Sequence, residues 1–160
     1  MPLNRRALEV IAILIALVLL GVMGYLLAGA AGLRLADGQP LFGDFIAFWS
    51  AGAAALDGHA ARVHDVSFVS DYSRDAIPGI GVVAPWNSPP TFLLIASALA
   101  TMPYPVAALV FLLASAAVYL FATRKILPDA RALIFTVTLP AAVYHLGTVQ
   151  AGLLIAGISA

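Results

Sequence analysis

The stretch TFLLIASALATMPYPVAALVFLLASAAVYLFAT, residues 91–123, contains no charged side chain. As one straight helix it would extend about 50 Å, at about 1.5 Å per residue, whereas the hydrocarbon core of a membrane is about 30 Å thick. The prolines at 103 and 105 predict a break, because proline lacks a backbone donor and disfavours helix at the residue before it. We therefore expect a short helix over residues 91–101, at the membrane interface or re-entering the membrane, and a membrane span over about residues 106–122.

The rest of the chain is also unusually apolar. Hydrophobic residues make up 62% of the 160 residues, charged residues make up 10%, and the mean hydropathy is +1.01, whereas soluble domains are about 45–50% apolar. Residues 10–33 form another uncharged stretch that is long enough to span a membrane. Residues 132–160 form a third, which we interpret as a span over 132–146 and a partial helix over 151–160, or as one tilted helix. The composition thus predicts an all-α integral membrane protein, with a single polytopic membrane domain over residues 1–160.

Charge is distributed unevenly along the chain. Two short segments hold five of the eight basic residues, namely Arg5, Arg6, Arg124, Lys125 and Arg131, and the positive-inside rule places both segments in the cytoplasm. Residues 34–90 hold six of the eight acidic residues and are expected to form a large extracytoplasmic loop. We therefore expect a multi-pass protein of the plasma (inner) membrane, with a cytoplasmic N-terminus and an uncleaved signal anchor.

Cysteine content and net charge exclude some classes of function. The sequence has no cysteine and a formal net charge of zero. Disulfides and thiolate metal sites are therefore excluded, and there is no basic block of the kind that binds nucleic acid.

The predicted loop contains GDFIAFWSAGAAALDGH, residues 43–59, in which one carboxylate heads an apolar, helix-patterned run. Asp44 occupies the position of an N-cap, whose side chain can accept backbone N–H groups of the first turn, and Gly58 is suited to end the helix. Because few polar residues lie opposite its aromatic face, the helix is expected to lie flat on the membrane, half covered by protein. Asp44 is then either a cap only, or a general base that takes a proton from a sugar hydroxyl.

Several landmarks follow one another in an order that resembles glycosyltransferase family 87. They are the long first apolar stretch, the G-D-F motif with its aromatic helix and D-G, Val63-His64-Asp65, Trp86-Asn87-Ser88-Pro89-Pro90, the M-P-Y-P hairpin and the turn at Gln150. The family comprises membrane mannosyltransferases of the GT-C class, which are polytopic helical bundles that use polyprenyl-phosphate sugars. The resemblance implies a GT-C-like bundle of which this chain is the N-terminal portion, since the family is usually more than twice as long.

The same resemblance implies roles for particular residues. Asp44 matches the acidic residue of the first extracytoplasmic loop that serves as catalytic base in this class. The candidate substrate-binding residues are Arg62, His64, Asp65, Trp86, Asn87, His145 and Gln150. No metal or cofactor is implied, because the lipid-linked sugar is itself the substrate and cationic or amide groups can stabilise the leaving phosphate. The sequence departs from the family pattern where His64 and Ser88 replace tyrosines, and where Val149 replaces the glycine before Gln150.

Simpler interpretations exist for several of these residues. Trp86 is also explained as an aromatic anchor at the membrane interface. His145 is also explained as a hydrated histidine at a helix end, and Arg62 as a solvated loop charge.

Two main functions remain open at the level of sequence, and a transporter is a weaker third, because the sequence lacks intramembrane charges and paired broken helices in two halves. The first is inverting transfer of a hexose, expected to be mannose, from a polyprenyl-phosphate donor to an extracytoplasmic glycan or glycolipid acceptor, with the 160 residues alone expected to be inactive. The second is a non-catalytic truncated membrane protein or a structural subunit. In both cases membrane lipid surrounds the chain, and the remaining helices of a longer chain or a partner subunit are expected to complete the bundle.

Overall fold

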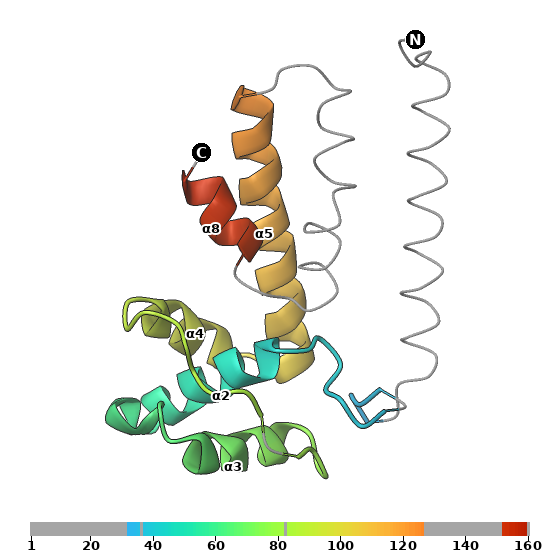
Figure 1. Ribbon diagram of the computed structural model, residues 1–160, viewed down its shortest axis with the longest axis vertical. Coiled ribbons are helices and arrows are strands. Elements are labelled where there is room, and N and C mark those ends of the chain that lie inside the picture. Colours follow the sequence, from blue (N-terminus) through green and yellow to red (C-terminus); the bar gives the residue numbers. More distant parts are fainter. Residues whose placement is uncertain (1–31, 36, 82, 127–151, 160) are drawn as a thin grey trace. The chain divides into compact units, whose positions relative to one another are not determined.

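The computed structural model describes residues 32–35, 37–81, 83–126 and 152–159. In chain order the elements are α2 (Phe45–Leu56), the 3-10 helix η1 (Ala60–Arg62), α3 (Val66–Ala76), α4 (Phe92–Ala100), α5 (Tyr104–Ile126) and α8 (Gly152–Ser159) (Figure 1). These ranges contain no strand, only an isolated antiparallel bridge between Arg34 and Pro40. The all-α prediction is confirmed for this part of the chain. The predicted span over 132–146 lies outside it, as do residues 10–31 of the first predicted span.

The break predicted at Met102-Pro103-Tyr104-Pro105 is present. The amide of Met102 donates to the carbonyl of Leu99 at 3.0 Å, which closes α4, and the amides of Val106 and Ala107 both donate to the carbonyl of Pro103 at 3.0 Å. Pro105 is the second residue of α5. The N–H groups of the first turn have no acceptor within the helix, so proline removes no helical hydrogen bond there. The two prolines therefore separate two helices rather than kink one.

The helix α5 is long and apolar enough to cross a membrane. It has 23 residues and contains the predicted span over 106–122. Among the described residues it is the one helix that passes this test of length and composition. The several spans predicted from the sequence therefore stay a prediction.

The chain divides into two compact units. One consists of residues 30–113 with 148–150, and we call it the helical unit; the other consists of residues 1–29, 114–147 and 151–160. The described part of the second unit is the C-terminal half of α5 together with α8. All the candidate site residues that the structure describes belong to the helical unit, so the fold of that unit is what positions them.

The helix α2 is the centre of the helical unit and packs against both α3 and α4 (Figure 1). Eight of its twelve residues are buried: Phe45, Ile46, Ala47, Phe48, Ser50, Ala51, Gly52 and Ala54. They surround most of the helix, whereas the sequence predicted that only half of it would be covered by protein. The reason is that α2 is apolar on nearly every side, and a helix of that kind is stabilised by burial all round. The helices expected within the predicted extracytoplasmic loop therefore include α2, which packs against both α3 and α4.

Glycine at position 52 sets the distance between α2 and α4. A Cβ atom built there would lie 2.2 Å from the carbonyl oxygen of Ala96 and 2.8 Å from the amide nitrogen of Ser97. These are backbone atoms, which cannot turn aside as a flexible side chain does. Only glycine at this position permits the observed approach of the two helices.

The end of α2 follows the sequence prediction closely. Gly58 has a φ of 83°, its amide donates to the carbonyl of Ala55 at 3.1 Å, and the next amide, of His59, donates to Ala54 at 2.9 Å. This pair of bonds is the Schellman arrangement, which needs a left-handed residue just past the helix. Gly58 therefore ends α2 as predicted.

The helix α3 is buried on one side only. Val69, Ser70 and Ser73 are buried, and the hydroxyls of Ser73 and Ser50 are 2.8 Å apart, which joins α3 to α2. Ser73 also lies 3.2 Å from the carbonyl of Val69, to which it donates. On the exposed side, Arg74 and Asp71 form an ion pair at 2.5 Å. The buried hydroxyls are thus satisfied within the helix pair, as buried polar groups need to be.

Candidate functional site

Asp44 follows a corner of unusual backbone geometry. Phe42 and Gly43 both have left-handed backbones, with φ of 71° and 53°. The corner is closed by the amide of Gly43, which donates to Pro40 at 3.0 Å, and by the amide of Phe45, which donates to Phe42 at 3.2 Å. Glycine tolerates such a φ, but for a bulky side chain like that of Phe42 it costs about 1–2 kcal/mol. The chain therefore pays a conformational cost immediately before Asp44.

Asp44 occupies the N-cap position of α2, but its side chain makes no capping hydrogen bond. Its backbone already has helical values, φ −69° and ψ −10°, whereas a capping residue usually has an extended backbone that turns its side chain back over the first turn. The residue is exposed. The interpretation of Asp44 as only a cap is therefore wrong.

A cluster of aromatic rings begins at Phe45, the residue after Asp44. The ring centroid of Phe45 lies 5.9 Å from that of Phe48 and 5.4 Å from that of Phe111 on α5. Phe48 in turn lies 5.3 Å from Phe111. These separations are within the 4.5–7 Å range of favourable aromatic pairs. The cluster fixes the start of α2 against the first half of α5.

Asp65 is the residue that does cap a helix. Its backbone is extended, with φ −82° and ψ 100°, and its carboxylate accepts from the amide of Phe68 at 3.2 Å and from the hydroxyl of Ser67 at 2.6 Å. The hydrogen bond from Ser67, followed by those from Phe68 and Arg62, holds the pKa of Asp65 below its usual value. Asp65 was predicted as a substrate-binding residue, and the structure gives it a structural task at the start of α3.

Arg62 is engaged with the same turn. Its guanidinium lies 3.2 Å from the carboxylate of Asp65 and 3.7 Å from the ring centroid of Phe68. Both Arg62 and Asp65 remain largely exposed, so the pair contributes little to stability. Arg62 is thus available to solvent while oriented by two neighbours.

His64 and Trp86 are brought together across the helical unit. The Nδ1 atom of His64 lies 3.3 Å from the carbonyl oxygen of Trp86, and the Trp86 ring packs on Phe48 with centroids 5.2 Å apart. The indole is buried, and its N–H has no acceptor among the described residues. Asn87, next along the chain, is exposed. His64 and Trp86 therefore meet, and Trp86 is packed in the interior rather than placed as a surface anchor.

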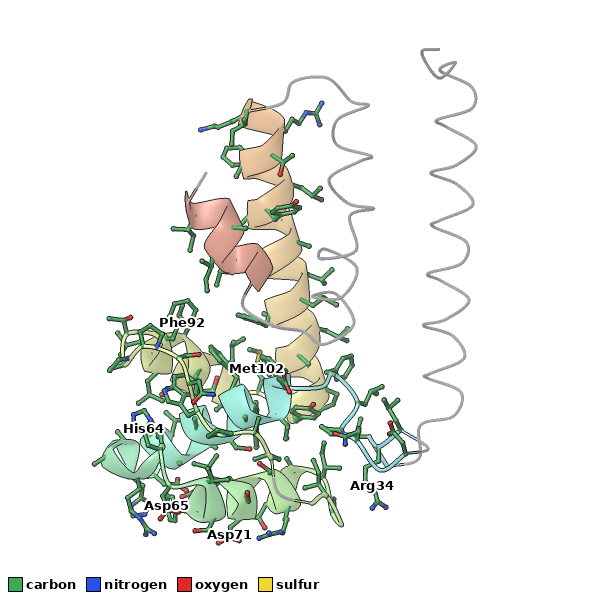
Figure 2. The ribbon with its side chains drawn as sticks, viewed as in Figure 1. Arg34, His64, Asp65, Asp71, Phe92 and Met102 are labelled. Atoms are coloured by element: carbon green, nitrogen blue, oxygen red, sulfur yellow. The ribbon has the colours of Figure 1, made fainter. Side chains whose placement is uncertain are left out.

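The candidate residues fall at two ends of α2. Asp44 stands before the helix, while Arg62, His64 and Asp65 stand at the start of the antiparallel helix α3 (Figure 1). Twelve helical residues separate these ends, which is about 18 Å at 1.5 Å per residue. Figure 2 shows His64 and Asp65 where α3 begins, and Met102 where α5 begins. The carbonyl of Met102 accepts a hydrogen bond from Trp49 Nε1 at 3.0 Å. The structure does not place Asp44 in hydrogen-bonding range of the Arg62–Asp65 turn.

Two other candidates, His145 and Gln150, lie outside the described residues. Sequence reasoning also missed Tyr104, which was noted only as part of the M-P-Y-P break. Its hydroxyl donates to the carbonyl of Leu41, 63 residues earlier in the chain. No local pattern in the sequence signals a contact over that separation.

No model of a known protein family, no curated protein and no solved structure matches the chain. The functional argument therefore rests on the sequence and on the geometry of the helical unit.

Proposed function

We propose that this chain belongs to an integral membrane glycosyltransferase in which Asp44 is the general base. The proposed reaction moves a hexose, with mannose as the expected sugar, from a polyprenyl-phosphate donor to a glycan or glycolipid acceptor outside the cytoplasm. The observation that carries the proposal is that the exposed carboxylate of Asp44 is not used to cap the helix it precedes.

The position of Asp44 relative to α5 supports the proposal. Phe42 and Phe45, on either side of Asp44, contact the ring of Tyr104 at centroid distances of 6.2 and 6.0 Å. Tyr104 is the first residue of α5, the candidate membrane span. If α5 crosses the membrane, Asp44 lies at the level of one end of the span, where a lipid-linked donor presents its phosphate and sugar.

Exposed apolar side chains on the helical unit also favour a membrane setting. Val106, Leu109, Val110 and Leu113 are each 42–67% exposed and follow the i, i+3, i+4, i+7 spacing of one helix face. On α4, Leu94 is 78% exposed. Water-facing surfaces rarely carry so many large apolar groups close together. We assign this face to lipid, which agrees with α4 being an interfacial helix.

The chemical step needs a base and a charge-stabilising group. The acceptor hydroxyl oxygen attacks the anomeric carbon while Asp44 takes the hydroxyl proton. The bond between the anomeric carbon and the phosphate oxygen breaks with inversion, and the electron pair leaves with polyprenyl phosphate. Donors that face the phosphate stabilise that charge without a metal. His64, Asn87 and Arg62 lie toward the other end of α2 from Asp44, so we propose them as contacts to parts of the substrates away from the reacting carbon. His145 and Gln150, which lie outside the described residues, are proposed as donors to the leaving phosphate.

The test is an activity measurement on the full-length protein, purified in detergent and added back to membranes from source cells that lack it. Those membranes supply the acceptor, and polyprenyl-phosphate mannose with a radiolabelled sugar supplies the donor. The Asp44→Asn variant keeps the size of the side chain and removes the base, so transfer should fall about 10²–10⁴-fold. Asp71→Asn, which changes an exposed carboxylate on α3, is the matched control and should retain transfer. Wild-type transfer by Asp44→Asn would exclude Asp44 as the base.

A second candidate is a non-catalytic subunit of a membrane complex. It is favoured by the engagement of Arg62 and Asp65 with each other, because a paired cap needs no substrate to explain it. The same assay separates the two proposals. Absence of transfer by the wild-type protein, together with co-purification of a second membrane protein through the α5 face, would favour the subunit.

A further inference from the structure

Tyr104 joins the start of α5 to both sides of Asp44. The side chain is almost fully buried, at 3% exposure. Its ring meets Phe42 edge-on and lies tilted over Phe45, and its hydroxyl donates to the carbonyl of Leu41. The contacts of this one side chain therefore reach residues before and after Asp44, namely Leu41, Phe42 and Phe45.

The corner needs such a support. Phe42 holds a left-handed backbone, with φ 71°, and a conformation of this kind persists only where surrounding groups fix it. The Tyr104 hydroxyl fixes the carbonyl just before Phe42, and the Tyr104 ring covers the Phe42 side chain. Without the hydroxyl, the Leu41 carbonyl loses a buried partner and Phe42 can return to a negative φ. That change would rotate the backbone that carries Asp44.

The hydroxyl is not required to hold α2 against α5. The Phe45–Phe111 and Phe48–Phe111 ring pairs join the two helices independently. In addition, Trp49 Nε1 donates to the carbonyl of Met102. The specific role of the Tyr104 hydroxyl is therefore at the corner, and the packing of the helices does not depend on it.

We propose that Tyr104 is a positioning residue that fixes the Asp44 carboxylate in its reactive orientation. The proposal rests on the proposed function, because it assigns Tyr104 an effect on the base of that reaction. A misplacement of about 1 Å in a catalytic group can cost about 10²-fold in rate. Loss of the hydroxyl should therefore lower kcat while substrate binding, and hence KM, changes little.

The first experiment compares Tyr104→Phe with Tyr72→Phe in the full-length protein. Both remove one hydroxyl from the helical unit, and the hydroxyl of Tyr72 donates to the exposed carboxylate of Asp57 at 3.0 Å. In Tyr104→Phe, kcat for hexose transfer should fall at least tenfold with KM within twofold of wild type. Amide hydrogen exchange of Gly43 and Phe45 should become at least tenfold faster, while exchange in α3 stays unchanged. Tyr72→Phe should leave kcat, KM and the exchange of Gly43 and Phe45 at wild-type values.

A second pair of variants tests the same corner by changing Phe42 and leaving Tyr104 in place. Phe42→Val places a β-branched residue where the left-handed backbone is least tolerated, and should lower kcat as Tyr104→Phe does. Phe42→Asn introduces a residue that accepts this backbone readily, and should retain kcat more fully than Phe42→Val. These variants decide the question if Tyr104→Phe does not fold.

The outcomes separate the two proposals. Unchanged exchange at the corner in Tyr104→Phe, or an equal kcat for Phe42→Val and wild type, would overturn the positioning role while leaving Asp44 as the base. Full transfer by Asp44→Asn would overturn the proposed function, even if exchange at the corner still responded to Tyr104→Phe. Faster exchange with an unchanged kcat would show that the corner moves without consequence for transfer, which also overturns the positioning role.

Discussion

The two helix starts at Asp44 and Asp65 look alike in the sequence and differ in the structure. Each aspartate directly precedes a helix of the helical unit. Asp65 has an extended backbone, and its carboxylate accepts from the amide of Phe68. Asp44 has a helical backbone, follows two left-handed residues, and makes no capping bond. The difference teaches that an aspartate before a helix is a cap only when its own backbone turns the carboxylate over the first turn.

The comparison also separates structural from functional roles. At Asp65 the unusual feature is in the side chain, which collects hydrogen bonds from Ser67, Phe68 and Arg62. At Asp44 the unusual feature is in the backbone, because the two residues before it, Phe42 and Gly43, have left-handed values of φ. Backbone strain of this kind gathers at functional sites. The corner before α2 is therefore the better place to look for chemistry.

The largest effect is expected from Gly52→Ala, which tests how closely α2, the helix between the two starts, packs against α4. The new Cβ would lie 2.2 Å from the Ala96 carbonyl oxygen, so α2 and α4 must separate. Overpacking of this kind costs about 3 kcal/mol at the upper end of its usual range. Thermal unfolding in detergent, followed by far-UV circular dichroism, should show the loss as a clearly lowered midpoint.

Gly58→Ala is the matched control for that experiment. A Cβ at Gly58 meets nothing within 4 Å, but the left-handed φ of 83° remains unfavourable, at a cost of about 1 kcal/mol. The change at Gly52 should therefore exceed the change at Gly58. Equal effects would mean that α2 and α4 do not approach as closely as described.

A smaller effect is expected when each aspartate is changed to alanine. Asp65→Ala removes the acceptor for the Phe68 amide, and that amide should then exchange with solvent about fivefold faster, a size typical of a lost N-cap. Asp44→Ala should leave the first-turn amides of α2 at wild-type exchange rates, because none of them is capped by that carboxylate. Faster exchange in the first turn of α2 after Asp44→Ala would restore the capping interpretation of Asp44.

The smallest effect is expected when the pH is lowered, and it concerns the N-terminal cap of α3. Hydrogen bonds, first of all the one from Ser67, hold the pKa of Asp65 below its usual value. A carboxyl whose pKa is lower in the folded state stabilises that state above its unfolded pKa, about 3.9, and the contribution is lost as the pH falls through the folded pKa. Protection of the Phe68 amide should therefore be complete near neutral pH and decline only below about pH 4. Asp65→Asn should remove this pH dependence.

Local features of the sequence predicted α4 and the end of α2, but they did not predict α3 (Val66–Ala76). The short helix expected over 91–101 is α4 (Phe92–Ala100). Its limits were predictable because prolines on both sides of it restrict the helix locally, whatever it packs against. Gly58 ends α2 for a similarly local reason, since the residue past the helix must be left-handed. The segment predicted as a membrane span, residues 106–122, lies within α5. These features depend on a few neighbouring residues.

Features set by contacts between distant residues were not predictable. Burial of α2 on most sides depends on α3 and α4, which the apolar pattern of α2 does not specify. The Tyr104 side chain that meets Leu41 and Phe42 comes from the start of α5, far along the chain. Of the candidate site residues, His64 and Trp86 do meet, whereas their role in binding a substrate stays a prediction. The separation of Asp44 from Arg62 and Asp65 required the structure.

The bond from Tyr104 to Leu41 also has a consequence for the order of events during biosynthesis. The two residues are 63 positions apart, and a ribosome adds about 5–20 residues per second. The acceptor carbonyl therefore exists for about 3–13 s before its donor has been made. Throughout that interval Phe42 lacks the partner that holds its left-handed backbone. The orientation of Asp44 is accordingly a late product of synthesis, completed only when the start of α5 has emerged and met a segment made seconds earlier.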